Sequence, residues 1–128
     1  MSRESLSEDV ERFIAQHIDS VEKLEILLLL ARNPQKSWSP REVFQQIQSS
    51  IPSVGKRLAE LERAALVKAD AEGNYQFRPG SEEGAAGVRR LIEAYEERRI
   101  KVIEVIYSPR KDELQLFSDV FRMRKDNE

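Results

Sequence analysis

Cysteine is absent from this 128-residue sequence, and histidine occurs once, as His17. The lack of cysteine excludes disulfide bonds, thiol catalysis and cysteine-ligated zinc. One histidine, without the ordered carboxylate spacing of a calcium loop, does not supply the ligands that a metal site needs. We therefore expect no metal and no cofactor, and we interpret His17 as a helix-end or surface residue.

Signatures of catalysis are also missing. The chain contains no glycine-rich phosphate loop and no nucleophile elbow. Adjacent acidic residues such as Glu96 and Glu97 point in different directions on a helix, so they do not form a paired acid and base. The sequence therefore predicts that the protein is not an enzyme.

Long hydrophobic runs are missing as well. The longest strongly apolar run covers residues 26–31, far short of the ~20 residues that a membrane-spanning helix needs. Residues 1–9 lack the apolar core of a signal peptide. We expect no membrane insertion and a cytoplasmic location.

Positive charge is not in excess, since the net charge is −2. Hydrophobic residues make up 40% and charged residues 34% of the chain, which is typical of one globular domain with a heavily charged surface. Proteins that bind nucleic acid through a large basic surface usually show a basic excess. Charge in this sequence must therefore be analysed segment by segment.

The first half of the chain carries strong helix signals. Ser7 and a stripe of apolar residues predict a helix from about Glu8 to Ile18. Asp19, with Glu22 three residues later, is expected to begin a second helix through a capping box. That helix is apolar over most of its circumference, so we expect it to be central to the core, and Asn33-Pro34 should end it.

A third and a fourth helix follow. Ser39, Pro40 and Glu42 form a strong start signal, and the buried face of the third helix is expected to contain Val43, Phe44 and Ile47. The fourth helix should run from about Ser53 to Ala64. Its inward stripe is predicted by apolar residues at helical spacing, and Gly55 costs it about 1 kcal/mol relative to alanine, which points to a close approach by a backbone or ligand. The stripe consists of Val54, Leu58, Leu61 and Ala65.

Two short strands and further helices complete the pattern. Residues 66–70 and 74–78 alternate between apolar and polar, and the turn between them contains Gly73, which predicts a β-hairpin. One helical stripe then runs from Val88 to Ile106. Residues 100–107 also alternate as a strand would, but no turn signal separates them from the preceding helix. A last amphipathic helix is expected around residues 114–121.

Two local features suggest packing roles. Trp38 precedes the capped third helix, and we interpret it as a core or boundary residue, with a ligand or partner anchor as the alternative. The small residues 84–87 begin a helix and suggest a close packing point.

Residues 24–30 (LEILLLL), 39–43 (SPREV) and 53–67 (SVGKRLAELERAALV) together resemble bacterial winged helix-turn-helix proteins of the MarR and PadR types. The match covers about half of the chain. The resemblance implies a transcription regulator whose recognition helix begins near Ser53, and whose flanking helices build a dimer. Two departures stand out: Ala65 occupies the usual glycine position after that helix, and the wing tip is acidic. We expect the strained alanine to make the helix end differently.

These observations predict a mainly α fold with a small β-hairpin. The architecture is a winged helix-turn-helix with an added N-terminal helix and two C-terminal helices. Residues 1–18 would form the N-terminal helix, 19–80 the winged helix-turn-helix, and 81–128 a helical extension for dimerisation or interaction.

The leading functional hypothesis is a DNA-binding transcription regulator that acts as a homodimer. Ser53, Lys56 and Arg57 would read the major groove, and Arg41 and Arg78 would contact phosphates. Lys56 and Arg57 lie off the inward stripe, so we expect them to face solvent or a groove. A solvated helix face, with Arg57 or Lys56 pairing locally with Glu60, is the simpler interpretation. Residues 39–79 carry six basic and five acidic residues, and a net of +1 is small for a module that neutralises several phosphates.

The C-terminal apolar stripe is interpreted as the dimer seam. The alternative function is a winged helix that does not bind DNA and instead recognises a protein, in a signalling or membrane-associated complex. The acidic wing and the net charge favour that alternative. The predicted seam contains Val88, Leu91, Ile92, Tyr95, Val102, Ile106, Phe117 and Phe121.

Overall fold

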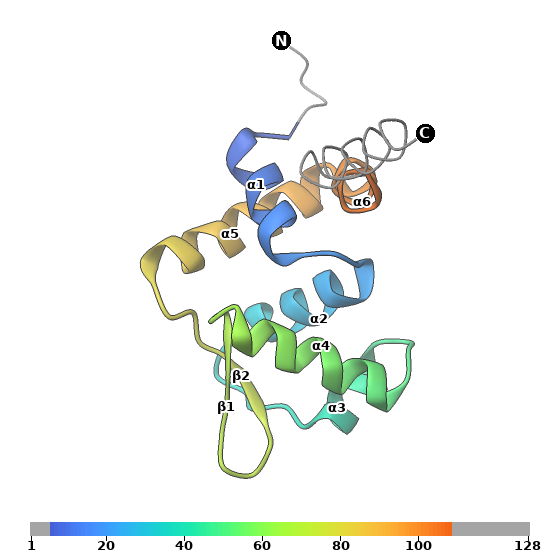
Figure 1. The fold of residues 1–128 in the computed structure, drawn as a ribbon, viewed down its shortest axis with the longest axis vertical. Coiled ribbons are helices and arrows are strands. Elements are labelled where there is room, and N and C mark those ends of the chain that lie inside the picture. The colour runs from blue at the N-terminus through green and yellow to red at the C-terminus, as the bar shows by residue number, and fades with distance from the viewer. Residues whose placement is uncertain (1–5, 109–128) are drawn as a thin grey trace, which may run out of the picture.

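The computed structural model describes residues 6–108, which fold into six helices and one two-stranded antiparallel sheet (Figure 1). The fold is therefore mainly α with a small hairpin, as predicted. In chain order the elements are α1 (Glu8–His17), α2 (Val21–Arg32), α3 (Pro40–Gln46), α4 (Ile51–Arg63), β1 (Val67–Ala69), β2 (Tyr75–Phe77), α5 (Glu82–Glu97) and α6 (Arg99–Tyr107).

Two groups of helices share one continuous hydrophobic core. Helix α4 packs against α2, α3 and β1, and α2 also contacts β2, so these elements form the helix-turn-helix and its wing. Helices α1, α5 and α6 pack on one another and lie together above α2 in Figure 1. Within residues 6–108 no helix is both long and apolar enough to cross a bilayer.

Serine residues begin most of the helices. In five helices a serine hydroxyl accepts a hydrogen bond from a backbone N–H in the first turn that follows. These serines are Ser7, Ser20, Ser39, Ser50 and Ser81. The capping box of Ser39 and Glu42 is present as predicted.

Two predicted helix starts differ from the structure by one or two residues. Helix α2 is capped by Ser20 rather than Asp19, and the Glu22 side chain does not close a capping box there but bonds to residues 49–57. Helix α4 begins at Ile51 rather than near Ser53, because Ser50 caps it and Pro52 fits its first turn.

The end of α4 also differs from the prediction. Ala65 adopts a left-handed backbone with φ of 62°, although alanine pays roughly 1–2 kcal/mol for it. The N–H of Leu66 donates to the carbonyl of Leu61 at 3.1 Å, and the N–H of Ala65 donates to that of Glu62 at 2.9 Å. These two bonds form a Schellman motif, and they satisfy carbonyls that the helix end would otherwise leave free.

The hairpin forms at the predicted place, with Val67 opposite Phe77 and Ala69 opposite Tyr75. Gly73 takes the positive φ that its turn requires. Trp38 adds a short bridge on the other side of Tyr75, since each residue's N–H donates to the other's carbonyl at 2.7 Å. Trp38 is buried, so its predicted packing role is confirmed.

The C-terminal stripe is helical, but it is not one helix. Arg98 leaves helical geometry, with φ of −139° and ψ of 56°, and it separates α5 from α6. The break lets α6 fold back on both α5 and α1, where Val102 and Ile106 become buried. A straight continuation of α5 would carry these residues away from α1. The strand alternative for residues 100–107 is thereby excluded, while the last predicted helix lies outside the described residues.

Apolar burial follows the predicted stripes with two exceptions. Ala65, predicted to complete the inward stripe of the fourth helix, is exposed because it lies beyond the end of α4 with a left-handed backbone. Val43 and Ile47 are buried, but Phe44 is 36% exposed, so its assignment to the inner face of α3 is wrong. Its position next to Val43 places it about 100° further around a short helix, away from the face that packs on the core.

Candidate nucleic-acid interface

The candidate interface is built on α4, which has three distinct flanks. Val54, Leu58 and Leu61 point into the core and are fully buried, as predicted. They anchor α4 against α2 and α3. Because the buried stripe covers only about a third of the circumference, the polar side chains on either side of it decide what α4 presents outward.

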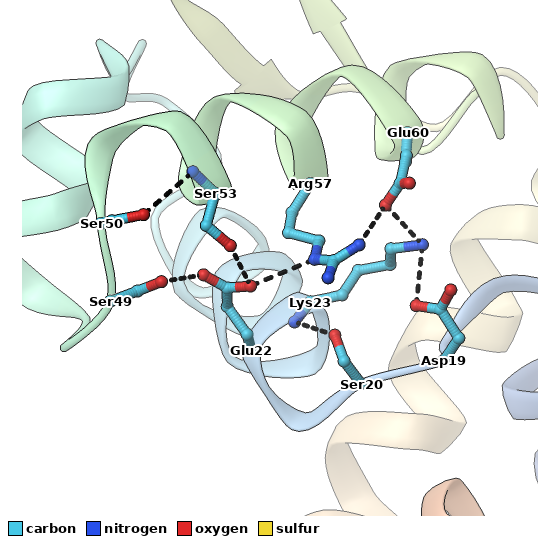
Figure 2. Close-up of polar contacts among 9 residues, drawn as sticks. All are labelled: Asp19, Ser20, Glu22, Lys23, Ser49, Ser50, Ser53, Arg57 and Glu60. Atoms are coloured by element: carbon cyan, nitrogen blue, oxygen red, sulfur yellow. Dashed lines mark hydrogen bonds and ion pairs between the residues drawn. The ribbon is translucent and has the colours of Figure 1, made fainter.

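One of these flanks faces α2 and is occupied by hydrogen bonds (Figure 2). The Ser53 hydroxyl donates to Glu22 Oε1 at 2.8 Å, and Arg57 Nε donates to the same oxygen at 3.1 Å. Ser49, in the turn before α4, donates its hydroxyl to Glu22 Oε2. The expectation that Arg57 faces outward is therefore wrong, because a carboxylate on α2 holds its guanidinium against the protein.

A buried lysine extends this network. Lys23 Nζ lies 3.0 Å from Glu60 Oε1 on α4 and 3.1 Å from Asp19 Oδ1, and its side chain is only 8% exposed. Arg57 Nη1 donates to the same Glu60 oxygen at 3.0 Å. The result is an alternating chain of charges, which we call the α2–α4 charge network, made of Asp19, Lys23, Glu60, Arg57 and Glu22 (Figure 2).

The network shifts the acidity of its members. Partial burial alone would raise the pKa of Glu22, but hydrogen bonds from Ser49, Ser53 and Arg57 outweigh burial and lower it. Hydrogen bonds to Glu60 and Glu22 raise the pKa of Arg57. The network therefore favours the charged forms of Glu22 and Arg57, and each carboxylate of the network is bonded to a partner within the chain.

The opposite flank of α4 is open. Residues at positions 52, 56, 59 and 63 follow helical spacing on one side, and Lys56 and Arg63 there are exposed. Ala59 is half-buried, and a Cβ built on the neighbouring Gly55 would meet no atom within 4 Å. This outer flank therefore combines small residues with two cations. Arg63 was absent from the predicted site, although its spacing of seven residues from Lys56 was a usable signal.

Acidic residues of the helix-turn-helix and wing are largely engaged within the chain. Glu42 accepts the N–H of Ser39 at 3.0 Å, and Glu62 accepts that of Ala69 at 3.0 Å. Asp70 accepts the N–H groups of Glu72 and Asn74 and so fixes the wing turn. With Glu60 in the charge network, four of the five acids between residues 39 and 79 have internal partners.

Basic residues of the same segment show the opposite pattern. Arg57 is paired, but no hydrogen bond or ion pair within residues 6–108 uses any of the other five side chains, which are all exposed. Five cations of this segment are therefore free to contact a partner, while carboxylates bonded to backbone N–H groups keep their negative charge and the net charge stays +1. The five cations are Arg41, Lys56, Arg63, Lys68 and Arg78.

The predicted phosphate contacts lie on two other elements. Arg41 is exposed in the first turn of α3. Arg78 follows β2 and, with Lys68 on β1, lines a shallow hollow of about 140 Å³ on one face of the wing. Lys68 and Gln76 are directly opposite in the hairpin register, so this face is shared by both strands. The structure thus brings Arg78 together with Lys68, which the sequence prediction did not include.

Most of the predicted dimer seam is already covered within the single chain. Val88, Leu91, Val102 and Ile106 are buried in the core, and Ile92 and Tyr95 pack against it. Phe117 and Phe121 lie outside the described residues. Exposed apolar side chains on α6 are instead Ile100 and Tyr107, each 73% exposed. Among residues 6–108, no cluster of His, Asp and Glu forms a candidate metal site.

Comparisons with known proteins identify the fold. No protein-family model matches the sequence, and no curated protein is significantly similar to it. The structure is similar to MepR, a transcription regulator of the Staphylococcus aureus multidrug efflux pump MepA, with a TM-score of 0.53 and 16% identity over 94% of this chain and 88% of MepR.

Two further structures are similar over most of their length. The S. aureus MepR–DNA complex has a TM-score of 0.52 and 17% identity, covering 94% of this chain and 90% of that one. A MarR-family transcriptional regulator from Silicibacter pomeroyi has a TM-score of 0.49 and 18% identity, covering 93% and 81%. The likeness to MepR, with the helix order and hairpin described above, confirms the predicted winged-helix fold.

Proposed function

We propose that this protein is a DNA-binding transcription regulator that acts as a dimer. The observation that carries the proposal is the imbalance of partners in residues 39–79: four acids are bonded internally, whereas five exposed cations have no partner in the described chain. Two of those cations lie on the outer flank of α4. Cations without internal partners are available to neutralise phosphates, which dominate the affinity of proteins for DNA. One structure of the same fold was solved with DNA bound to MepR.

The outer flank of α4 suits a DNA groove. Lysine and arginine contact phosphates or the edges of guanine, and alanine packs against the methyl group of thymine. Lys56, Ala59 and Arg63 supply these groups on one exposed face. Gly55 leaves the helix backbone open there, so a groove wall meets no bulky side chain. We therefore assign base contact to Lys56 and Arg63 in place of Ser53 and Arg57, with Arg41, Lys68 and Arg78 on phosphates.

DNA selection and binding titrations test this function. The protein is first used to enrich duplexes from a random-sequence library, and its affinity for the enriched duplex is then measured by fluorescence anisotropy between 50 and 300 mM salt, a range of about sixfold. Lys56→Ala and Arg63→Ala should each weaken binding to the enriched duplex by about 1–3 kcal/mol and relax its sequence specificity. Lys68→Ala and Arg78→Ala should each reduce the slope of log K against log salt by about 0.9 for each phosphate that the removed cation neutralises.

Matched variants separate site effects from general charge effects. Lys101→Ala and Arg89→Ala remove the same charges from α6 and α5, and they should leave both the affinity for the enriched duplex and the salt slope unchanged. If the library yields no enriched duplex, or if the Lys56 and Arg63 variants behave like these controls, the DNA-binding proposal is refuted.

Dimerisation rests on a different face. Ile100 and Tyr107 are seven residues apart, so they lie on one side of α6, and both are largely exposed. Two exposed apolar side chains on one side of a helix suit burial against a second surface. We propose that a second copy of the chain does so, and light scattering should then give twice the monomer mass.

A protein-binding role is the second candidate. The exposed Ile100 and Tyr107 favour it equally, because apolar side chains on a helix also suit a different protein as partner. The two functions separate in the experiments above. A monomer that enriches no DNA would support the protein-binding role.

A further inference from the structure

Within residues 6–108, Glu22 on α2 is the side chain whose hydrogen bonds connect the start of α4 and the turn before it to the rest of the fold. Its two carboxylate oxygens accept bonds from Ser49, Ser53 and Arg57. These donors come from the α3–α4 turn, the first turn of α4 and its second turn. A single carboxylate therefore fixes three successive points along the chain at the end of α4 that would enter a groove (Figure 2).

The geometry restrains rotation of α4 about its own axis. The apolar stripe allows some rotation, because smooth aliphatic contacts are not directional. Hydrogen bonds are directional, and an arginine that donates to two carboxylates is held in a fork. Ser53 and Arg57 donate to Glu22, and Lys23 pairs with Glu60. These contacts join α4 to α2, so a rotation of α4 stretches or breaks them.

Rotation matters for what α4 presents. Lys56 and Arg63 lie on the exposed flank of α4, beside the flank whose residues bond to α2. The buried stripe of Val54, Leu58 and Leu61 excludes a large rotation of α4, but a small rotation moves the exposed side chains relative to a groove. The position of the Glu22 carboxylate thus sets where Lys56 is directed.

We propose that Glu22 is a positioning residue for DNA recognition, which sets the rotation of α4 and thereby the sequence specificity of binding without contacting DNA. This inference rests on the proposed function. It predicts that loss of Glu22 lowers the affinity for the preferred sequence while leaving the general attraction to DNA intact.

Glu22→Gln tests the inference, because the amide keeps the size of the side chain but removes the charge that binds Arg57. The control is Glu25→Gln, which removes the same charge from the same helix at an exposed residue that has no bonded partner in the described chain. Both variants are titrated with the duplex enriched by the wild-type protein and with a shuffled duplex of equal composition. Urea unfolding and stoichiometric titration give the stability and the active fraction.

Glu22→Gln should weaken binding to the enriched duplex roughly tenfold, the size expected when one base-pair contact is misplaced, and should change binding to the shuffled duplex by less than about threefold. Glu25→Gln should preserve the ratio of the two affinities. A merely structural role would reduce the active fraction and lower both affinities together, which overturns the inference, as does an unchanged ratio. If the wild-type protein enriches no duplex, the proposed function itself fails and this inference fails with it.

Discussion

Gly87 of α5 packs closely against Phe13 of α1. A Cβ built on Gly87 would lie 2.5 Å from Phe13 Cδ2 and 2.6 Å from Cε2. Gly55, in the interior of α4, has no atom within 4 Å of the same built position. Both glycines are in helices, so replacement by alanine offers each the same gain in helix propensity and differs only in the space available.

The magnitudes follow from this contrast. Alanine is favoured over glycine inside a helix by about 1 kcal/mol, so Gly55→Ala should raise the free energy of unfolding by about that amount. At Gly87 the ring of Phe13 must move, and this ring is buried and in edge contact with His17 at 4.8 Å between centroids. Overpacking of a well-packed core costs roughly 1–3 kcal/mol. Gly87→Ala should therefore lower the free energy of unfolding by about 1 kcal/mol, a difference of about 2 kcal/mol between the variants.

Urea unfolding followed by circular dichroism measures both variants at one fixed protein concentration, because association would add to the apparent stability. Phe13→Leu supplies the second arm of a double-mutant cycle. In that background the ring edge is gone, and Gly87→Ala should no longer destabilise the protein. If Gly87→Ala instead stabilises the wild-type protein as much as Gly55→Ala does, the close packing of α1 on α5 is refuted.

Three further changes have defined outcomes. Ala65→Gly should raise the unfolding free energy by about 1 kcal/mol in urea unfolding, since glycine adopts φ of 62° without strain; no gain would contradict the described helix end. Burial, followed by the nearby Lys23, lowers the pKa of His17 in the folded state. The free energy of unfolding should therefore fall as the pH drops below about 6.5. His17→Gln should make the urea midpoint less dependent on pH between 7.5 and 5.5, whereas an unchanged pH dependence would exclude His17 as its cause. Ile100→Glu should give a monomer in light scattering, whereas an intact dimer would place the interface elsewhere.

Local sequence signals predicted the helices and the hairpin well, because capping and periodic burial act over a few residues. Ser39 with Glu42 and the stripe of Val54, Leu58 and Leu61 needed no information from distant parts of the chain. Gly73 likewise marked the wing turn. The winged-helix fold could therefore be predicted from the sequence.

The candidate site was only partly predictable. Lys56 is exposed as expected, but Arg57 is turned toward α2. The sequence alone does not indicate which of two adjacent polar residues on a helix will bind a distant carboxylate. Glu22 had an equally plausible local role as a capping residue, and only the approach of α4 to α2 decided between the two.

The sequence by itself determined which residues form helices, which turn forms the wing, and which side of each helix is apolar, since these depend on neighbours within about one or two helical turns. The tertiary structure alone decided the partner of Arg57, the break at Arg98 and the left-handed Ala65. These features depend on contacts between segments of the chain that come together only on folding, and at Ala65 such contacts outweigh a local cost of about 1–2 kcal/mol.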